Sequence, residues 1–184
     1  DTNREHYRHE GVTIEELFEA DKKVLLPIPD TDFDSSRYQT AKTDKWGRFT
    51  LEEGKHEYSA SPELSSGLVW LKITSDKVFV MDMNYKPIVT HRRLYGNYKQ
   101  SVMDWVPYLT AISRKPRSLF NSGIYEMMPE SMQTYVKSCS STDRGKILKC
   151  LAEQTKRTGF DSALQTVEQA LMYQATDPDS LQNL

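Results

Sequence analysis

Residues 37–93 read RYQTAKTDKWGRFTLEEGKHEYSASPELSSGLVWLKITSDKVFVMDMNYKPIVTHRR, and this stretch decides the fold of the chain. It consists of short runs rich in β-branched and aromatic residues, separated by glycine, proline, asparagine and aspartate. Such runs at close spacing are typical of a small antiparallel barrel or curled sheet. The predicted strands are Tyr38–Thr43, Arg48–Leu51, Lys55–Ala60, Leu68–Thr74, Lys77–Met83 and Pro87–Arg92. We therefore expect a small antiparallel β-barrel of five to six strands within residues 37–100.

Two turns that contain glycine reverse the chain between the first three predicted strands. Residues 44–47 (Asp-Lys-Trp-Gly) separate the first two strands, and Gly47 can take the positive φ that such a turn requires. Residues 52–54 (Glu-Glu-Gly) join the second and third strands as a hairpin loop. Both turns favour antiparallel neighbours.

The flanks of this β region differ from it. In residues 1–36, Thr13 and Glu16 form the pattern of a capping box, which predicts a short helix from Ile14 that ends by Lys23. Val24 to Pro29 contains two prolines and is predicted to be extended. The acidic stretch Asp30–Ser36 is predicted to be a loop and a domain boundary.

Residues 101–184 have helical periodicity. Ser101 is predicted to cap a helix over Val102–Ile112, in which Pro107 would cause a kink or a division into two short pieces. Gly159 is predicted to end one of the later helices, and residues 176–184 are predicted to fray. The further helices are expected over residues 117–128, 130–138, 143–157 and 161–175. The chain is thus predicted to be α+β, with a short helix and extended linker, a barrel, and a C-terminal group of helices.

Charge is distributed unevenly over these three parts. Residues 37–117 hold 14 Lys and Arg against 8 Asp and Glu, a net charge of +6, whereas the whole chain carries −2. Residues 1–36 carry −6 and residues 118–184 carry −2. A basic, aromatic-rich β unit is a plausible nucleic-acid surface, and the alternative is that the charges are scattered for solubility.

The composition excludes several classes of protein. There is no run of 18 apolar residues, so no segment is expected to span a membrane. The two cysteines, Cys139 and Cys150, suggest buried helix residues in a reducing cytosol. Neither this pair nor His6 with His9 makes a zinc site. No phosphate-binding loop, nucleophile elbow or cluster of catalytic carboxylates is present. The residues alone thus argue against an active site.

A few basic and aromatic residues are candidates for contacts with a nucleic acid. Arg92 and Arg93 either clamp phosphate or pair with the acidic first segment. Trp70 and Trp105 are expected in the core, which leaves Trp46 as the exposed tryptophan. His91 is expected to be structural. The candidate DNA-binding residues are Lys45, Trp46, Arg48, Arg92, Arg93, Lys115 and Arg117.

The order of several motifs resembles a known family. They are Asn3-Arg4, then His6 or His9, then residues 11–18 (GVTIEELF), 26–29 (LPIP), 44–50 (DKWGRFT), 56–62 (HEYSASP), 91–96 (HRRLYG) and Lys115-Pro116. In this order they are similar to the C-terminal part of IstA-type insertion-sequence transposases, which belong with the Mu-like and retroviral-integrase-like recombinases. The resemblance covers residues 1 to about 120, and the later helices fit it only loosely.

The resemblance implies a DNA recombinase with a carboxylate metal site in an RNase H-like core. By that likeness residues 1–36 are the linker leaving this core, whose catalytic residues and magnesium would lie upstream of Asp1. Residues 37–100 would be the barrel and residues 101–184 a helical region. The fragment would then be non-catalytic and without cofactor. Its partners would be DNA, other transposase subunits and a partner ATPase, in a bacterial cytoplasm with no membrane contact.

Two roles are compatible with this likeness. In the first, the basic barrel holds the DNA backbone and helps to assemble the transposase–DNA complex during transposition. In the second, the barrel and the helices dock other subunits or the ATPase without contacting DNA, since the first 36 residues complement the charge of the basic region. Salt-dependent binding to a duplex distinguishes them.

Overall fold

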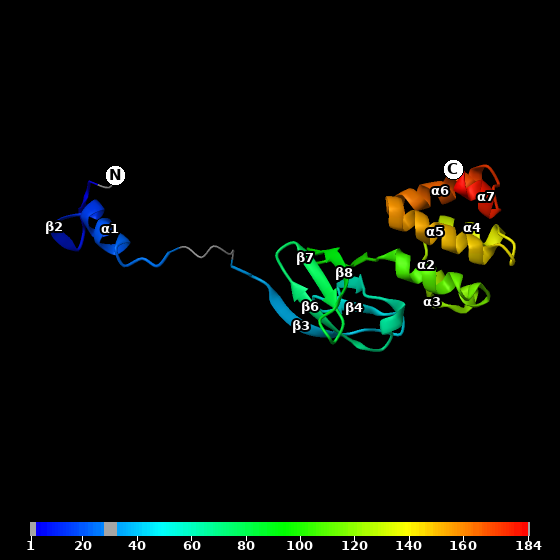
Figure 1. The fold of residues 1–184 in the computed structure, drawn as a ribbon, viewed down its shortest axis with the longest axis horizontal. Coiled ribbons are helices and arrows are strands. Elements are labelled where there is room, and N and C mark those ends of the chain that lie inside the picture. Colours follow the sequence, from blue (N-terminus) through cyan, green and yellow to red (C-terminus); the bar gives the residue numbers. More distant parts are fainter. Residues whose placement is uncertain (1–2, 28–32, 184) are drawn as a thin grey trace. The chain divides into compact units, whose positions relative to one another are not determined.

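The computed structural model describes residues 3–27 and 33–183 (Figure 1). The chain divides into two compact units, Asp1–Asp34 and Ser35–Leu184. Both helices and β-sheets are present, so the chain is α+β as predicted. The first unit is small, and the second holds all the strands predicted within residues 37–93 together with the C-terminal helices.

The first unit consists of a short hairpin followed by a helix. Strand β1 (Glu5–His6) pairs with β2 (His9–Thr13), a hairpin that the sequence did not predict. Helix α1 (Ile14–Lys22) begins with the predicted capping box, in which the Thr13 side chain accepts from the Glu16 amide at 3.2 Å. None of the α1 residues is buried, and Phe18 is 54% exposed. None of the described residues 3–27 is buried, so this part of the unit forms no core of its own.

The β part of the second unit contains two sheets. The larger sheet is antiparallel, with the order β3-β6-β7-β8. The smaller sheet has the order β4-β5-β9, in which β9 runs parallel to β5. The strands are β3 (Arg37–Lys42), β4 (Arg48–Leu51), β5 (His56–Ser59), β6 (Leu68–Ile73), β7 (Lys77–Met81), β8 (Pro87–Arg92) and β9 (Gln100–Val102). The six predicted strands are thus confirmed within two residues at each end.

The predicted closed barrel is not confirmed. Among the described strands, no ladder joins the larger sheet to the smaller one, so the two remain separate sheets. In the smaller sheet β5 is central, and the edge strands β4 and β9 pair with no strand of the larger sheet among the described residues. The inner faces of the two sheets instead share one core, to which Phe49 and Tyr58 contribute from the smaller sheet and Val69, Leu71 and Val80 from the larger.

Residues 58–62 (Tyr-Ser-Ala-Ser-Pro) link this core to its surroundings. The Tyr58 hydroxyl accepts from the Leu94 amide at 2.8 Å, and burial raises the pKa of this phenol. The Ser59 carbonyl lies 2.7 Å from Nε2 of His91, which is buried in the larger sheet. Pro62 begins the short 3-10 helix η1 (Pro62–Leu64). The segment thus ties the two sheets together, and His91 has the structural role predicted for it.

The buried position of His91 makes the stability of the fold dependent on pH. Burial lowers the pKa of His91, so the unfolded chain takes up this proton at a higher pH than the folded chain does. The contribution of the buried neutral His91 to stability is complete above the pKa of histidine in the unfolded chain, about 6.5. It is lost as the pH falls from there through the lowered pKa of the folded chain. Urea unfolding is expected to show a midpoint that drops below about pH 6.5. In His91→Gln the drop in this window should shrink, and an unchanged profile would contradict the assignment.

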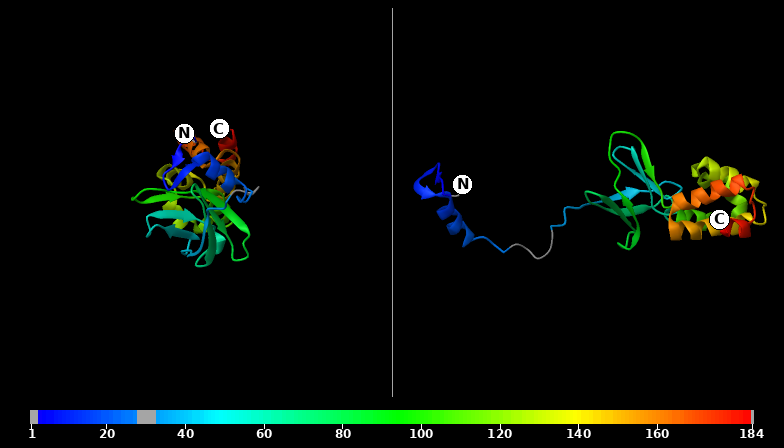
Figure 2. Two further views of the ribbon diagram at one scale, coloured as in Figure 1. Left: turned by 90° about the vertical axis from the view of Figure 1, so that its left-hand side faces the viewer. Right: turned by 90° about the horizontal axis from the view of Figure 1, so that it is seen from above.

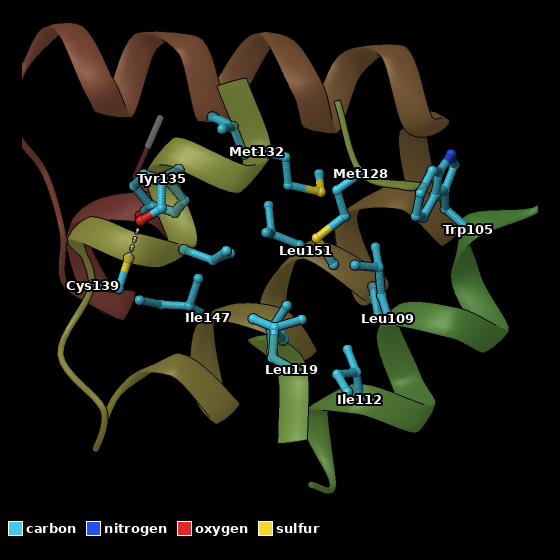
Figure 3. Packing of buried hydrophobic residues seen from close by; sticks show 14 of the residues in the cluster. Trp105, Leu109, Ile112, Leu119, Met128, Met132, Tyr135, Cys139, Ile147 and Leu151 are labelled. Atoms are coloured by element: carbon cyan, nitrogen blue, oxygen red, sulfur yellow. Dashed lines mark hydrogen bonds between the residues drawn. The ribbon is translucent and has the colours of Figure 1, made fainter. Parts of the chain in front are cut away.

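Helices form the other end of the second unit (Figures 1 and 2). Side chains from α2, α4 and α5 converge in their core, where Leu109, Met132 and Leu151 are fully buried (Figure 3). Trp105 is also buried there, as predicted. The helices are α2 (Trp105–Ser113), η2 (Pro116–Asn121, 3-10), α3 (Gly123–Met127), α4 (Glu130–Ser138), α5 (Arg144–Thr158), α6 (Phe160–Met172) and α7 (Pro178–Gln182).

Three predictions for this region were wrong: the N-cap at Ser101, the kink at Pro107 and the frayed C-terminus. Ser101 lies in β9, and α2 begins later with Asp104 as its N-cap, whose side chain accepts from the Val106 amide at 3.1 Å. Pro107 therefore falls in the first turn, where its missing N–H has no partner to lose, and no kink is needed. At the C-terminus, residues predicted to fray form α7, because Leu181 is buried in the helical core.

The β part and the helices are joined around Gly47 and Trp46. The Gly47 carbonyl accepts from the Tyr108 hydroxyl of α2 at 3.3 Å and from the Ala60 amide at 2.8 Å. A Cβ at Gly123 of α3 would lie 2.4 Å from the Trp46 ring, so the indole packs directly on this glycine. These contacts hold the first turn of the β part against α2 and α3.

Candidate nucleic-acid interface

The larger sheet has one face toward the core and one face away from it. Successive side chains of a strand alternate between faces, so Val69, Leu71 and Ile73 of β6 point inward, whereas Leu68, Trp70 and Lys72 point outward. Cross-strand partners share a face, and the register extends this assignment to β3, β7 and β8. The outer face consists of Tyr38, Thr40, Lys42, Leu68, Trp70, Lys72, Lys77, Phe79, Met81, Thr90 and Arg92.

The charge of this outer face is entirely positive. None of the four strands β3, β6, β7 and β8 contains an aspartate or a glutamate. Four cations lie on the face: Lys42, Lys72, Lys77 and Arg92. The smaller sheet differs, because its Arg48 is paired with Glu57. The outer face therefore presents a concentrated field that attracts anions.

Two of these cations are placed directly opposite each other. Lys77 of β7 is the register partner of Arg92 of β8, and both side chains are exposed. In the described part of the chain, neither makes an ion pair. Like charges opposite each other across two strands are destabilising unless a counter-ion neutralises them. This juxtaposition concentrates positive charge on the outer face at β7 and β8.

Two carboxylates belong to the turns at the ends of these strands. Oδ1 of Asp76 accepts from the Thr74 hydroxyl at 2.9 Å in the turn between β6 and β7. Oδ1 of Asp82 accepts from the amides of Asn84 and Lys86 in the turn between β7 and β8. Both carboxylates are therefore used to shape turns.

Aromatic side chains lie among the cations of the outer face. The Lys72 ammonium is 5.7 Å from the ring centroid of Tyr38, and Trp70 stacks on Tyr85 with centroids 5.4 Å apart. The prediction that Trp70 belongs to the core was wrong, because the strand alternation places it outside, half-buried. The sequence contains the information needed to place it. Trp70 is two residues from Lys72 and so lies on the same side of the strand, whereas Val69, Leu71 and Ile73 lie on the opposite, buried side.

Three predicted contact residues lie in the turn between β3 and β4. Lys45 is exposed, with its ammonium 5.2 Å from the Trp46 ring. Trp46 is half-buried against the helical core, so the prediction that it is exposed was wrong. The Arg48 guanidinium donates to the Asp44 carboxylate at 2.8 and 3.0 Å and to that of Glu57 at 2.9 Å. Burial raises the pKa of Asp44, but hydrogen bonds from the backbone amides of Arg48 and Trp46, together with the Arg48 guanidinium, hold it below its usual value. Arg48 is thus tied to two acids.

Arg92 and Arg93 are neighbours in sequence but face different surroundings. Arg92 ends β8 on the outer face. Arg93 donates from a guanidinium nitrogen to the Thr74 carbonyl at 3.0 Å, and another of its nitrogens lies 3.9 Å from the Glu52 carboxylate. The carboxylate near Arg93 thus comes from the β region itself, whereas the sequence suggested one from the acidic first segment. Arg92 is the better placed of the two for a phosphate.

Lys115 and Arg117 lie on the helical part. Lys115 precedes η2 and Arg117 is within it, and both are exposed. In residues 3–27 and 33–183, no hydrogen bond, ion pair or ring contact joins either of them to the other five predicted residues. The structure therefore does not gather the seven predicted residues into one site. The sequence analysis did not single out the other cations of the outer face, Lys42, Lys72 and Lys77.

A cavity of about 350 Å³ lies beside Arg93, between the β4–β5 hairpin and residues 94–97. Its lining includes Lys55 and Arg93 but also Glu52 and Glu53. Lys55 already contacts Asn97 at 2.6 Å and Glu53 at 3.9 Å. Because both signs of charge line this cavity and already pair, it does not favour an anion as the outer face does.

The described residues contain neither a metal-binding cluster nor a membrane-spanning helix. In the part of the chain that the structure describes, no three His, Cys, Asp or Glu side chains are grouped to hold a metal ion. No described helix combines the length and apolar character needed to cross a membrane.

Comparisons with protein-family profiles, curated proteins and solved structures found no match to the chain.

Proposed function

We propose that the second unit binds the DNA backbone through the outer face of its larger sheet. The observation that carries this proposal is the pairing of Lys77 with Arg92 across β7 and β8, in a sheet whose four strands contain no carboxylate. A phosphate group between two such cations removes their mutual repulsion and accepts hydrogen bonds from both. Lys42 and Lys72 extend the positive face across the sheet.

In this proposal the chain is the non-catalytic C-terminal region of an IstA-type transposase. The two packed sheets take the place of that family's barrel, and they help to assemble the transposase–DNA complex during transposition. The support is the ordered resemblance over residues 1 to about 120, together with the roles of its motifs. The Gly47 carbonyl contacts α2, and residues 58–62 bridge the two sheets. Motif 91–96 begins at the bridging histidine, His91.

Salt dependence is the test of backbone binding. If all four cations of the outer face neutralise phosphates, the slope of log affinity against log salt should be about −3.6 for a duplex, with a dissociation constant on the order of 10⁻⁴ to 10⁻⁶ M near physiological salt. In Arg92→Gln the slope should change to about −2.7, because one phosphate contact is lost. Fluorescence anisotropy with a labelled duplex across a salt series measures both quantities.

The matched control is Lys146→Gln, which removes the same charge from an exposed position on α5. Its slope should remain that of the unchanged chain. Equal slopes for Arg92→Gln and the unchanged chain would remove the outer face from the interface. The same assay with Lys115→Gln tests whether the helical part adds a further contact.

A protein-contact function has separate support in the first unit. Helix α1 buries none of its residues and exposes Ile14 and Phe18 one turn apart. Such a face favours contact with another protein surface, which the resemblance implies to be a transposase subunit or the partner ATPase. If the chain binds no duplex at low salt, and a purified catalytic core or ATPase retains it in a pull-down, this second function is the better account.

A further inference from the structure

The aromatic residues of the outer face are not needed for the core. The core of the two sheets is built from the opposite face, where Val69, Leu71 and Val80 are fully buried. Tyr38 is 53% exposed, and Trp70 and Phe79 are half-buried on the outer face. Binding a DNA backbone requires cations alone, so these rings call for a further explanation.

The register arranges these rings in rows with the cations. Tyr38 of β3 lies opposite Lys72 of β6, and Lys72 lies opposite Phe79 of β7. Adjacent strands are about 4.8 Å apart, so the two rings flank the lysine at roughly 10 Å from each other. The next row along β6 places Trp70 between Thr40 and Met81. Aromatic and basic side chains thus alternate over the same surface.

The turn between β7 and β8 adds a fourth ring to this surface. Tyr85 has φ of 62°, a left-handed conformation that is unusual for a bulky residue. Its amide donates to the Asp82 carbonyl at 3.0 Å, and the Asp82 carboxylate accepts from two further amides of the turn. The turn thereby holds the Tyr85 ring against Trp70, while Tyr85 remains 59% exposed.

We infer that the outer face binds an unpaired segment of DNA in preference to a duplex, with bases stacked on Tyr38, Phe79 and Tyr85. In a duplex the bases stack on one another and only phosphates reach a flat sheet, so exposed rings gain nothing. In a single strand each base offers a free π-face, and sheets that combine exposed aromatic rings with cations bind such strands by stacking. Lys42, Lys77 and Arg92 would then hold the phosphates. This inference rests on the proposed function, since it names the form of DNA that the same face takes.

The experiment compares one labelled 12-nucleotide strand with its blunt duplex by fluorescence anisotropy on the full chain. At about 0.2 M salt, where the backbone contribution is screened, the single strand should bind at least about tenfold more tightly. Tyr38→Leu and Phe79→Leu should each weaken the single strand roughly five- to 150-fold, the range expected for the loss of one stacked base. Duplex affinity should change less than about twofold, because no cation is removed.

Tyr173→Leu is the matched control, since Tyr173 is 72% exposed at the end of α6 and should leave both affinities unchanged. Circular dichroism and retained duplex binding show that the variants are folded. Equal affinities for the two forms of DNA, unaffected by the Tyr38 and Phe79 variants, would overturn the inference and leave backbone binding intact. Loss of self-association in these variants, with no change in DNA affinity, would overturn it in favour of a protein interface. No binding of either DNA at low salt would overturn the proposed function as well.

Discussion

Replacing Gly47 by alanine is expected to lower the free energy of unfolding by about 2–5 kcal/mol. Gly47 has φ of 73°, and a Cβ built on it would lie 1.8 Å from the Ser61 carbonyl oxygen. The left-handed conformation costs a non-glycine residue about 1–2 kcal/mol. The remainder comes from displacing residues 58–62, which are held in place by several hydrogen bonds. Urea unfolding followed by far-UV circular dichroism measures the change.

Gly54→Ala is the matched control for this prediction. Gly54 also has a positive φ, 86°, but a Cβ at this position would have no other atom within 4 Å. Only the conformational cost of about 1–2 kcal/mol is therefore expected for it. If the two variants lost the same stability, the close approach of Gly47 to Ser61 would not matter, and this joint would have no special role. Since small domains are stable by only about 5–15 kcal/mol, the larger loss can unfold a substantial fraction of the protein.

Replacing Tyr58 by alanine is expected to cost about 3–5 kcal/mol, the range for removing a buried aromatic side chain. Tyr58 is fully buried and stacks on Phe49 with ring centroids 5.5 Å apart. Its hydroxyl also holds the backbone at Leu94, just after β8. The loss should appear as a lower urea midpoint with an unchanged dependence on denaturant, as for a two-state change in stability alone.

Tyr58→Phe separates the ring from the hydroxyl. It keeps the packing but leaves the Leu94 amide without its acceptor, at a cost of about 1–3 kcal/mol. The alanine variant should therefore be clearly the less stable of the two. If phenylalanine and alanine cost the same, the hydroxyl and not the buried ring would dominate at this position.

The strands were predictable from sequence because their signals are local. Alternating apolar residues bounded by turn residues located all six predicted strands, and Gly159 ends α5 with a positive φ as expected. Strand β9 was missed because its residues, Gln100–Val102, show no alternation and its partner β5 is distant in the chain. Helix α7 was missed although Asp177 and Pro178 are a recognisable start: the Asp177 side chain accepts from the Ser180 amide at 2.8 Å.

The site was less predictable because it depends on which residues face one another. The sequence placed Arg48 among the DNA contacts, but the turn from Asp44 and the neighbouring strand bring two carboxylates to it. Lys77 is the reverse case. Its sequence context does not distinguish it from other surface lysines, and only the pairing of β7 with β8 places it opposite Arg92. Net charge over a segment therefore indicates where basic residues are concentrated, but it does not show which of them, like Arg48, are paired with carboxylates.

The parallel pairing of β9 with β5 has a consequence for synthesis on the ribosome. The hairpins β4–β5 and β6–β7 join neighbouring segments and can close as soon as they emerge. The register partner of His56 is Gln100, so the second edge of β5 stays open until that later residue has been made. An open strand edge is a template for pairing with another chain. A nascent chain that pauses before Gln100 would thus expose this edge of the central strand β5 to other chains, and the edge is covered when β9 reaches the sheet.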